Sequence, residues 1–301
     1  MNFFLDVTYD FKIITMRLLF SALALLISYN SWCQIPFPPE SKVLCLGDSR
    51  VEGSDTYDSY RYEFWKDLID CNWDFDLVGT QIDPISYPSY QNNNFDANHQ
   101  GIGGYTTYDV LFELPDVLSD IGTVDIVLLG IGGNDALNEG SSSIPDAIEN
   151  INSIIELIQS NNPQVLILIE QIAPGLNSMM TSDLTQALTM INNDIEVLAS
   201  NLTTPSSNVI AVDMSYDWQD AYLADDVHYN STGAEIVATR YSDALKTIYN
   251  CNTENSIQEL QYERSLINTV NLLGKEVNHT TNQIIFHIYD DGSVEKRFVV
   301  E

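Results

Sequence analysis

Apolar runs of strand length alternate with segments of helical periodicity from residue 41 to about residue 251. This alternation is typical of a parallel β-sheet covered by helices on both faces. We therefore expect an α/β fold, a flavodoxin-like three-layer α/β/α sandwich around a five-stranded parallel sheet. The candidate strands are 42–46, 75–79, 125–130, 164–170 and 208–213, and the candidate helices are 59–70, 107–119, 144–159, 182–200 and 232–249.

The pattern changes after residue 252. An apolar segment at 266–277 is followed by another at 284–296, which contains Asp291-Gly292, a dipeptide typical of tight turns between strands. This pattern predicts a small β appendage over residues 260–301, separate from a main domain at 41–251.

The beginning of the chain has the features of an export signal. A basic residue, Arg17, precedes the apolar stretch 18–27, which is too short to span a bilayer comfortably. We expect residues 1–33 to be a signal peptide cleaved near Cys33-Gln34, so the protein is predicted to be secreted or held at the cell surface. The alternative, a lipoprotein acylated at Cys33, is disfavoured by the bulky Trp32.

Composition narrows the class of protein. The hydrophobic fraction of 45% is ordinary for a globular core, and 301 residues suffice for one large domain with an appendage. The formal net charge is −31, so the field of the whole protein repels polyanions, and nucleic-acid binding is not expected. We interpret the excess of acidic residues as a means of keeping the protein soluble in an extracellular or salty medium.

Three cysteines follow the predicted signal peptide. Cys45 lies in an apolar strand and is expected to be buried. Cys71 and Cys251 end the first and last predicted helices, which lie side by side in a flavodoxin-like sheet. An exported protein can form a disulfide between them, and two free thiols are the alternative.

Histidines limit where catalysis can occur. Two of the four, His279 and His287, lie in the predicted appendage, which leaves His99 and His228 for the main domain. A hydrolase that activates a serine needs an imidazole and a carboxylate that orients it. Asp225 precedes His228 by three residues, so one short loop can supply both groups.

A candidate nucleophile follows the first predicted strand. Ser49 belongs to Gly47-Asp48-Ser49, and two further polar loops contain Gly104 and Asn134. Taken singly, these loops are ordinary turns and helix caps. Because strand ends of a parallel sheet meet at one edge, their joint occurrence with Asp225 and His228 favours one catalytic site.

These blocks resemble those that define the SGNH hydrolases, also called GDSL esterases. The resemblance implies that Ser49 is the nucleophile, His228 the general base and Asp225 the residue that orients it. It also implies an oxyanion hole formed by the backbone N–H groups of Ser49 and Gly104 and the side-chain amide of Asn134. No cofactor is implied.

Within this family the chain most resembles the acetyl xylan esterases of carbohydrate esterase family three. The segments that carry the likeness are 60–63, 75–80, 98–105 and 131–135. The resemblance implies an enzyme that removes acetyl groups from a polysaccharide or oligosaccharide. The alternatives are a lysophospholipase or broad short-chain acyl esterase and, from another class, a non-catalytic glycan-binding surface module. The sequence contains little that could form the long apolar lid of a lipid esterase, which favours short acyl groups.

Three residues near the blocks are candidates for substrate binding. Arg50 stands where the family usually has an apolar residue, and Gln100 where an acidic one is frequent. Tyr105 either stacks on a sugar ring or packs at a helix start. His99, in the loop before Gly104, is expected at most to line the pocket. We therefore expect Arg50, His99 and Tyr105 to be the substrate-binding residues.

The remaining acidic residues of the blocks are predicted to fix loops. Asp48 and Asp135 are expected to accept hydrogen bonds within their turns rather than to bind metal, and no cluster of side chains suggests zinc. Asp226 is an alternative partner for His228, but the family spacing selects Asp225.

The end of the chain resembles the sorting tails of the type IX secretion pathway. Leu-Leu-Gly-Lys-Glu at 272–276 and Tyr-Asp-Asp-Gly at 289–292 match that pattern. The resemblance implies that the secretion machinery is a partner. The alternative is an ordinary hairpin packed on the main domain.

Overall fold

The computed structural model describes residues 34–251, 265–277, 283–290 and 292–299. It forms two compact units, one up to residue 252 and one from residue 253. The boundary between them coincides with the change of pattern in the sequence. The predicted signal peptide lies outside the described residues.

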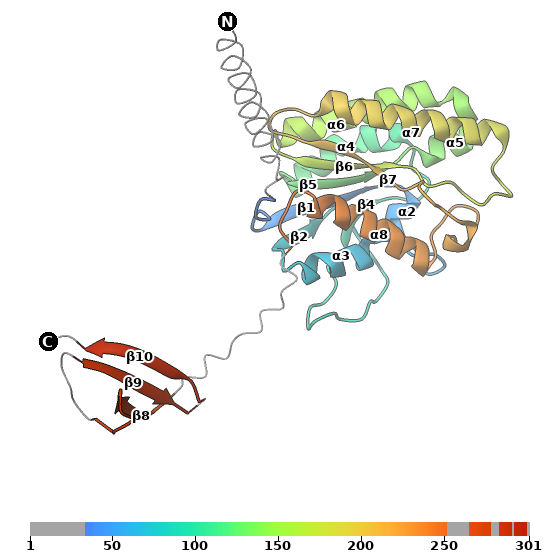
Figure 1. Ribbon diagram of the computed structural model, residues 1–301. Helices are drawn as coiled ribbons and strands as arrows, with labels where there is room; N and C mark the ends of the chain where they lie inside the picture. The colour runs from blue at the N-terminus through green and yellow to red at the C-terminus, as the bar shows by residue number, and fades with distance from the viewer. Residues whose placement is uncertain (1–33, 252–264, 278–282, 291, 300–301) are drawn as a thin grey trace, which may run out of the picture. The chain divides into compact units, whose positions relative to one another are not determined.

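Within residues 34–251, seven strands form one twisted sheet (Figure 1). The order is β3-β4-β1-β5-β6-β7, and β2 also pairs with β1. β2 pairs with the first half of β1 and β4 with its last two residues, so both lie along the same edge of β1. Every pairing is parallel except that of β3 with β4. The strands are β1 Ser41–Gly47, β2 Phe75–Val78, β3 Gln81–Ile82, β4 Asn98–Gly101, β5 Ile126–Gly130, β6 Leu166–Gln171 and β7 Val209–Asp213.

The prediction of a flavodoxin-like α/β fold is confirmed, but the sheet is larger than five strands. All five predicted strands are present in the order β2-β1-β5-β6-β7. β3 and β4 were not predicted because β4, Asn98-His99-Gln100-Gly101, has no apolar side chain. Gln100, which is buried, instead bonds across the sheet edge: its Oε1 accepts from the backbone N–H and hydroxyl of Thr80 at 2.9 and 2.8 Å.

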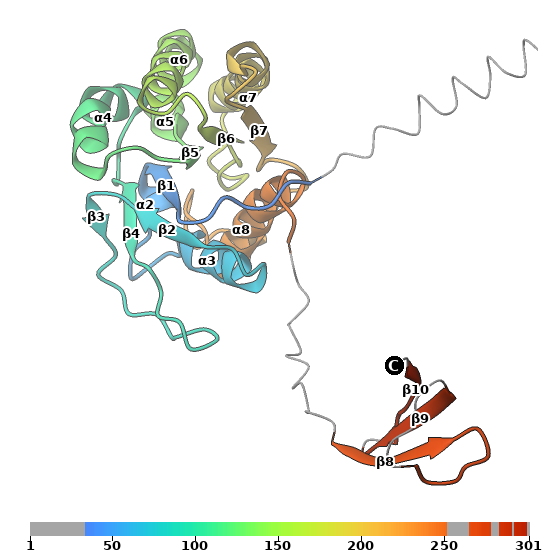
Figure 2. The ribbon, with the colours of Figure 1, turned by 90° about the vertical axis from the view of Figure 1, so that its left-hand side faces the viewer.

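Helices cover both faces of the sheet, as predicted (Figures 1 and 2). One face carries α3 and α8, and the other carries α4, α6 and α7. The caps of α7 and α8 are clear in the sequence, because Thr181 Oγ1 accepts from the Leu184 N–H and Asn230 Oδ1 from the Gly233 N–H, both at 3.1 Å. The helices are α2 Ser49–Glu52, α3 Arg61–Asp70, α4 Thr107–Ile121, α5 Gly133–Glu139, α6 Ile144–Asn161, α7 Ser182–Leu202 and α8 Ser231–Lys246, with short 3₁₀ turns η1 Gly140–Ser142 and η2 Asp220–Tyr222.

Alternate residues of the central strands pack into two separate cores. In β1, Val43 and Cys45 lie in the core under α3 and α8, whereas Leu44 and Leu46 lie in the core under α4, α6 and α7. A central strand buried on both faces needs a continuous apolar run, which is why β1, β5 and β6 could be recognised in the sequence.

A disulfide joins Cys71 to Cys251, with the two Cα atoms 4.5 Å apart. It connects the end of α3 to the segment after α8, and these two helices pack side by side. Of the two alternatives left by the sequence, the structure has the bridge. Cys45 is a free, buried thiol, as predicted.

The second unit is a three-stranded antiparallel sheet of β8 Leu266–Asn271, β9 Gln283–Tyr289 and β10 Val294–Val299, in the order β10-β9-β8. The predicted hairpin joins β9 to β10, and the Gly292 N–H donates to the Tyr289 carbonyl at 3.1 Å with Gly292 at φ 79°. Asp291 of the predicted turn lies outside the described residues. The first predicted strand stops at Asn271, because a turn that ends at Gly274, with φ 73°, follows it.

None of the helices in the part of the chain that the structure describes is both long enough and apolar enough to cross a membrane.

Candidate active site

The polar loops identified in the sequence meet at the carboxyl edge of the sheet. Ser49 begins α2 directly after β1, and Asn134 lies in the first turn of α5 after β5. Gly47 permits this arrangement, because a Cβ there would lie 2.0 Å from the Gly130 carbonyl oxygen. The close approach of β1 and β5 brings the two loops together.

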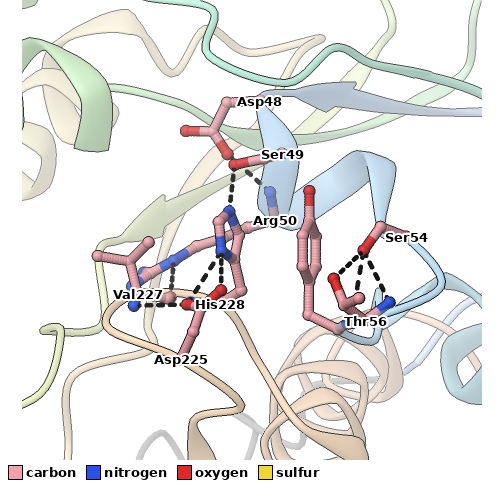
Figure 3. Close-up of polar contacts among 9 residues, drawn as sticks. Asp48, Ser49, Arg50, Ser54, Thr56, Asp225, Val227 and His228 are labelled. Carbon is pink, nitrogen blue, oxygen red and sulfur yellow. Dashed lines mark hydrogen bonds and ion pairs between the residues drawn. The ribbon is translucent and has the colours of Figure 1, made fainter.

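Ser49, His228 and Asp225 form a hydrogen-bonded chain (Figure 3). The Ser49 hydroxyl lies 2.9 Å from His228 Nε2, and His228 Nδ1 lies 2.8 Å from Asp225 Oδ2. An imidazole held in this way can take the proton of the serine while the carboxylate stabilises the resulting imidazolium. Asp226, the alternative carboxylate, uses its backbone carbonyl to accept from the Leu176 N–H.

Local hydrogen bonds keep Asp225 ionised. Its Oδ1 accepts from the backbone N–H groups of Val227 and His228 at 2.9 and 2.8 Å. Burial works to raise the pKa of Asp225, but these two bonds and the bond to the His228 ring lower it below its ordinary value. The side chain therefore carries its charge at neutral pH.

An aromatic residue that the sequence analysis missed stacks on this histidine. The rings of Tyr57 and His228 have centroids 3.8 Å apart and planes 12° apart. The loop that carries Tyr57 is fixed by Ser54, whose hydroxyl accepts from the backbone N–H groups of Thr56 and Tyr57 (Figure 3). The Asp58 N–H donates to the Tyr229 carbonyl at 2.9 Å, so this loop is also tied to the residue after His228.

Two of the three predicted oxyanion donors, Asn134 and Gly104, lie next to Tyr105. Asn134 Nδ2 donates one hydrogen to the Tyr105 carbonyl at 2.9 Å, which leaves its second amide hydrogen for another acceptor. Gly104 has φ 80°, and a Cβ there would meet nothing within 4 Å. The positive φ of residue 104 therefore favours glycine at this position through its backbone conformation.

The three predicted substrate-binding residues lie in different surroundings. Arg50 borders the cavity beside Ser49, but its Nε donates to the Val227 carbonyl at 2.8 Å and its Nη1 to the Ala173 carbonyl at 2.7 Å. Tyr105 packs against the core under α4, and its hydroxyl donates to Glu113 at 2.6 Å, which favours the packed-aromatic alternative. His99 is 3% exposed and borders a different cleft.

Two acidic residues fix loops, as predicted. Asp48 Oδ1 accepts from the Arg50 N–H at 3.0 Å at the start of α2. Asp135 accepts from the backbone N–H and the hydroxyl of Thr107 at 3.0 and 2.7 Å, which joins α5 to α4. Among the described residues, no three His, Cys, Asp or Glu side chains are grouped so that they could hold a metal ion.

A small cavity, here called the serine pocket, opens beside Ser49 and Asn134 and has a volume of about 40 Å³. Glu170 of β6 also lines it and was not singled out in the sequence because it directly follows an apolar run. Burial raises the pKa of Glu170 to about 7, and its Oε1 accepts from the Tyr241 hydroxyl at 2.8 Å. The walls are mainly apolar and include Ile131, Leu137, Ile172, Met179, Met180 and Leu188.

Solved structures with the same fold include several esterases. A carbohydrate esterase family 3 protein from Talaromyces cellulolyticus is 24% identical with a TM-score of 0.59, over 68% of this chain and 96% of that one. A family 3 carbohydrate esterase from Clostridium thermocellum is 22% identical with a TM-score of 0.53, over 69% and 98%. A lipase/acylhydrolase from Enterococcus faecalis is 16% identical with a TM-score of 0.51, over 68% and 95%. The comparison with curated proteins finds no match.

Family membership rests on a sequence match rather than on the shared fold. The model of the GDSL-like Lipase/Acylhydrolase family matches residues 45–236, which is more than half of the chain and includes all the loops described above. The chain therefore belongs to the GDSL-like lipase/acylhydrolase family, also called the SGNH hydrolases, and is a hydrolase that acts on esters.

Proposed function

We propose that the protein is a serine esterase that removes acetyl groups from a polysaccharide or its oligosaccharides, with Ser49 as nucleophile, His228 as general base and Asp225 as its orienting carboxylate. The observation that carries the proposal is the continuous chain of hydrogen bonds from Ser49 through His228 to Asp225, at 2.9 and 2.8 Å. No cofactor takes part in this chemistry.

The proposed mechanism follows the movement of charge. His228 takes the Ser49 proton as Oγ attacks the acetyl carbonyl, and the carbonyl oxygen becomes an oxyanion. The backbone N–H groups of Ser49 and Gly104 and the second amide hydrogen of Asn134 stabilise that charge. His228 then gives the proton to the leaving sugar hydroxyl, and water releases acetate from the acyl-enzyme by the same steps.

The acyl group is proposed to enter the serine pocket. At about 40 Å³ the serine pocket is narrow, and its lining is mainly apolar. A narrow apolar pocket favours acetyl and other short acyl groups over a lipid chain. The apolar walls make a broad short-chain acyl esterase the second candidate function, ahead of a lysophospholipase.

A carbohydrate substrate is supported by the similar folds. Two of the related structures are family 3 carbohydrate esterases. The net charge of −31 favours a neutral polymer over a polyanion as substrate.

We also propose that the protein is exported through residues 1–33 and directed to the cell surface or medium by residues 260–301 through the secretion machinery. The Cys71–Cys251 disulfide supports an oxidising destination. Comparing the full chain with a chain truncated before residue 260 in cell and medium fractions tests this part. Equal export of both chains would refute the role of the tail.

The catalytic assignment is tested by Ser49→Ala. We expect p-nitrophenyl acetate hydrolysis to fall by roughly 10⁵-fold or more with an unchanged melting temperature. Ser160→Ala, on the exposed surface of α6, is the matched control and should retain full activity. A folded Ser49→Ala protein with near wild-type turnover would refute the nucleophile.

The substrate class is tested by measuring hydrolysis of esters that differ in acyl chain length and in the alcohol that carries the acyl group. We expect activity on acetyl and butyryl p-nitrophenyl esters, little on octanoyl esters, and release of acetate from acetylated xylan. An enzyme that prefers octanoyl esters and leaves acetylated xylan untouched would refute the carbohydrate proposal. Binding of glycans without Ser49-dependent hydrolysis would instead favour the glycan-binding module.

A further inference from the structure

A second cavity, here called the polar cleft, lies next to the proposed catalytic residues and has a volume of about 480 Å³. It is far larger than the serine pocket, and many of its wall residues are polar. One wall is the end of α2 and the loop that follows it, and the opposite wall is β3 and the segment after it. The cleft is lined by Glu52, Gly53, Ser54, Asp55, Gln81, Ile82, Pro84, Ile85 and His99.

Glu52 connects this cleft to the serine. A Cβ built on Gly103 would lie 2.7 Å from Glu52 Oε2 and 3.9 Å from Ser49 Cβ, so both side chains border the same space above Gly103. Glu52 also lies near Tyr57: burial raises the pKa of Tyr57 first, and the negative charge of Glu52 raises it next. Tyr57 covers one face of His228. The cleft therefore lies close to the Ser49–His228 pair, through Glu52.

His99 presents a hydrogen-bond donor at this cleft. Its Nδ1 accepts from the Gly101 N–H at 3.1 Å, which assigns the ring proton to Nε2. Burial, and after it the charge of Arg61, lower the pKa of His99 to about 3, so the ring is neutral. Among the residues that the structure describes, its Nε2–H has no hydrogen-bond partner. His99 lines the cleft, so a ligand there can accept this hydrogen bond in place of water.

A hydrogen-bond acceptor, the carboxylate of Glu52, also lines the cleft. The Glu52 carboxylate makes no hydrogen bond and no ion pair with any side chain or backbone group in the described part of the chain. Arg61 fixes both walls, because its Nη2 donates to the Glu52 carbonyl at 2.8 Å and to Asp83 Oδ2 at 2.7 Å. The cleft is thus formed before a ligand arrives, which reduces the entropic cost of binding.

We propose that the polar cleft binds the sugar that carries the ester, with Glu52 accepting and His99 donating hydrogen bonds to its hydroxyl groups, while the acyl group occupies the serine pocket. A neutral pyranose presents hydroxyl groups that both donate and accept, which matches this pair. The inference rests on the proposed function and adds to it the site and the residues that recognise the alcohol half of the substrate.

The test compares an ester that contains the sugar with one that lacks it. We would measure kcat and KM for an acetylated xylo-oligosaccharide and for p-nitrophenyl acetate with the wild type, Glu52→Gln and His99→Phe. Each variant should lower the ratio of kcat/KM for the sugar ester to that for p-nitrophenyl acetate by roughly tenfold, mainly through KM. Glu149→Gln, the same chemical change on the exposed surface of α6, is the matched control and should leave the ratio unchanged.

A second measurement separates this inference from the proposed function. Unacetylated xylopentaose should inhibit p-nitrophenyl acetate hydrolysis competitively, and Glu52→Gln should weaken that inhibition by a similar factor. If the wild type hydrolyses p-nitrophenyl acetate through Ser49 but releases no acetate from any acetylated sugar, the proposed substrate is refuted. Inhibition of p-nitrophenyl acetate hydrolysis by xylopentaose still tests sugar binding in the cleft in that case. Equal losses on both esters, or inhibition that is absent or unaffected by Glu52→Gln, would overturn the sugar site.

Discussion

The Cys71–Cys251 bridge allows a quantitative prediction. It closes a loop with a sequence separation of 180 residues, and replacing both cysteines with alanine opens that loop. In the chain-entropy model the bridge removes roughly 18 cal/mol/K from the unfolded chain, or about 5 kcal/mol at 25 °C. Measured bridges usually contribute about 2–4 kcal/mol, so we expect a loss in that range with 5 kcal/mol as the upper limit.

The native state should survive the change. Trp73 Nε1 donates to the Asn250 carbonyl at 2.7 Å, and the Ile35 N–H donates to the Ile248 carbonyl at 2.9 Å. These bonds hold the end of the main domain in place without the disulfide. The loss of stability should therefore arise in the unfolded state, and esterase turnover at 25 °C should not change.

Urea unfolding of oxidised wild type, reduced wild type and the Cys71→Ala/Cys251→Ala variant measures the effect. Reduced wild type controls for the two sulfur atoms, which the alanines remove. At roughly 2–4 °C for each kcal/mol, a loss of about 2–4 kcal/mol should lower the melting temperature by about 4–16 °C. A free energy of unfolding that differs by less than about 0.5 kcal/mol between oxidised and reduced protein would refute the reasoning, as would peptide mapping that finds both thiols free.

Other predictions concern the catalytic groups. His228→Ala should lower activity on p-nitrophenyl acetate far more than His99→Ala, because of these two histidines only His228 contacts Ser49. The reverse ranking in matched kinetics would mean that the base is misassigned. Asn134→Ala should lower kcat by roughly two to three powers of ten with a smaller change in KM, since the proposed donor acts mainly in the transition state. A change in KM alone would instead assign Asn134 a role in substrate binding. Tyr57→Leu should lower kcat by roughly 2–10-fold, because a stacked ring contributes about 0.5–1.5 kcal/mol, whereas Tyr57→Phe keeps the ring and should retain kcat. Equal losses in both variants would assign the effect to the hydroxyl group.

The fold was predictable where burial requires a simple pattern. β1, β5 and β6 are covered on both faces, so their sequences are continuous apolar runs that any reading of periodicity finds. β4 was missed because its burial depends on hydrogen bonds of His99 and Gln100 rather than on apolar side chains. Such bonds depend on tertiary contacts that the local sequence does not reveal.

The candidate site was predictable only in part, for a similar reason. Ser49, Asn134, Asp225 and His228 each belong to a short motif that follows a strand, and parallel topology brings such motifs together. Tyr57 and Glu170 belong to no motif. Tyr57 contacts His228 from a loop 171 positions earlier in the numbering, and Glu170 follows the apolar residues of β6. Their positions at the site therefore follow only from the tertiary structure.

Arg50 has a consequence for how the enzyme loses activity. Its guanidinium links the turn that carries the serine to the Val227 carbonyl, next to the histidine, and to the Ala173 carbonyl after β6. Each of these bonds opens when either partner moves, so the serine turn and the histidine loop should open as one cooperative unit. Heating would then abolish turnover in a single step that exposes the backbone amides of both loops together, and hydrogen exchange at Val51 and Val227 would report the same opening free energy.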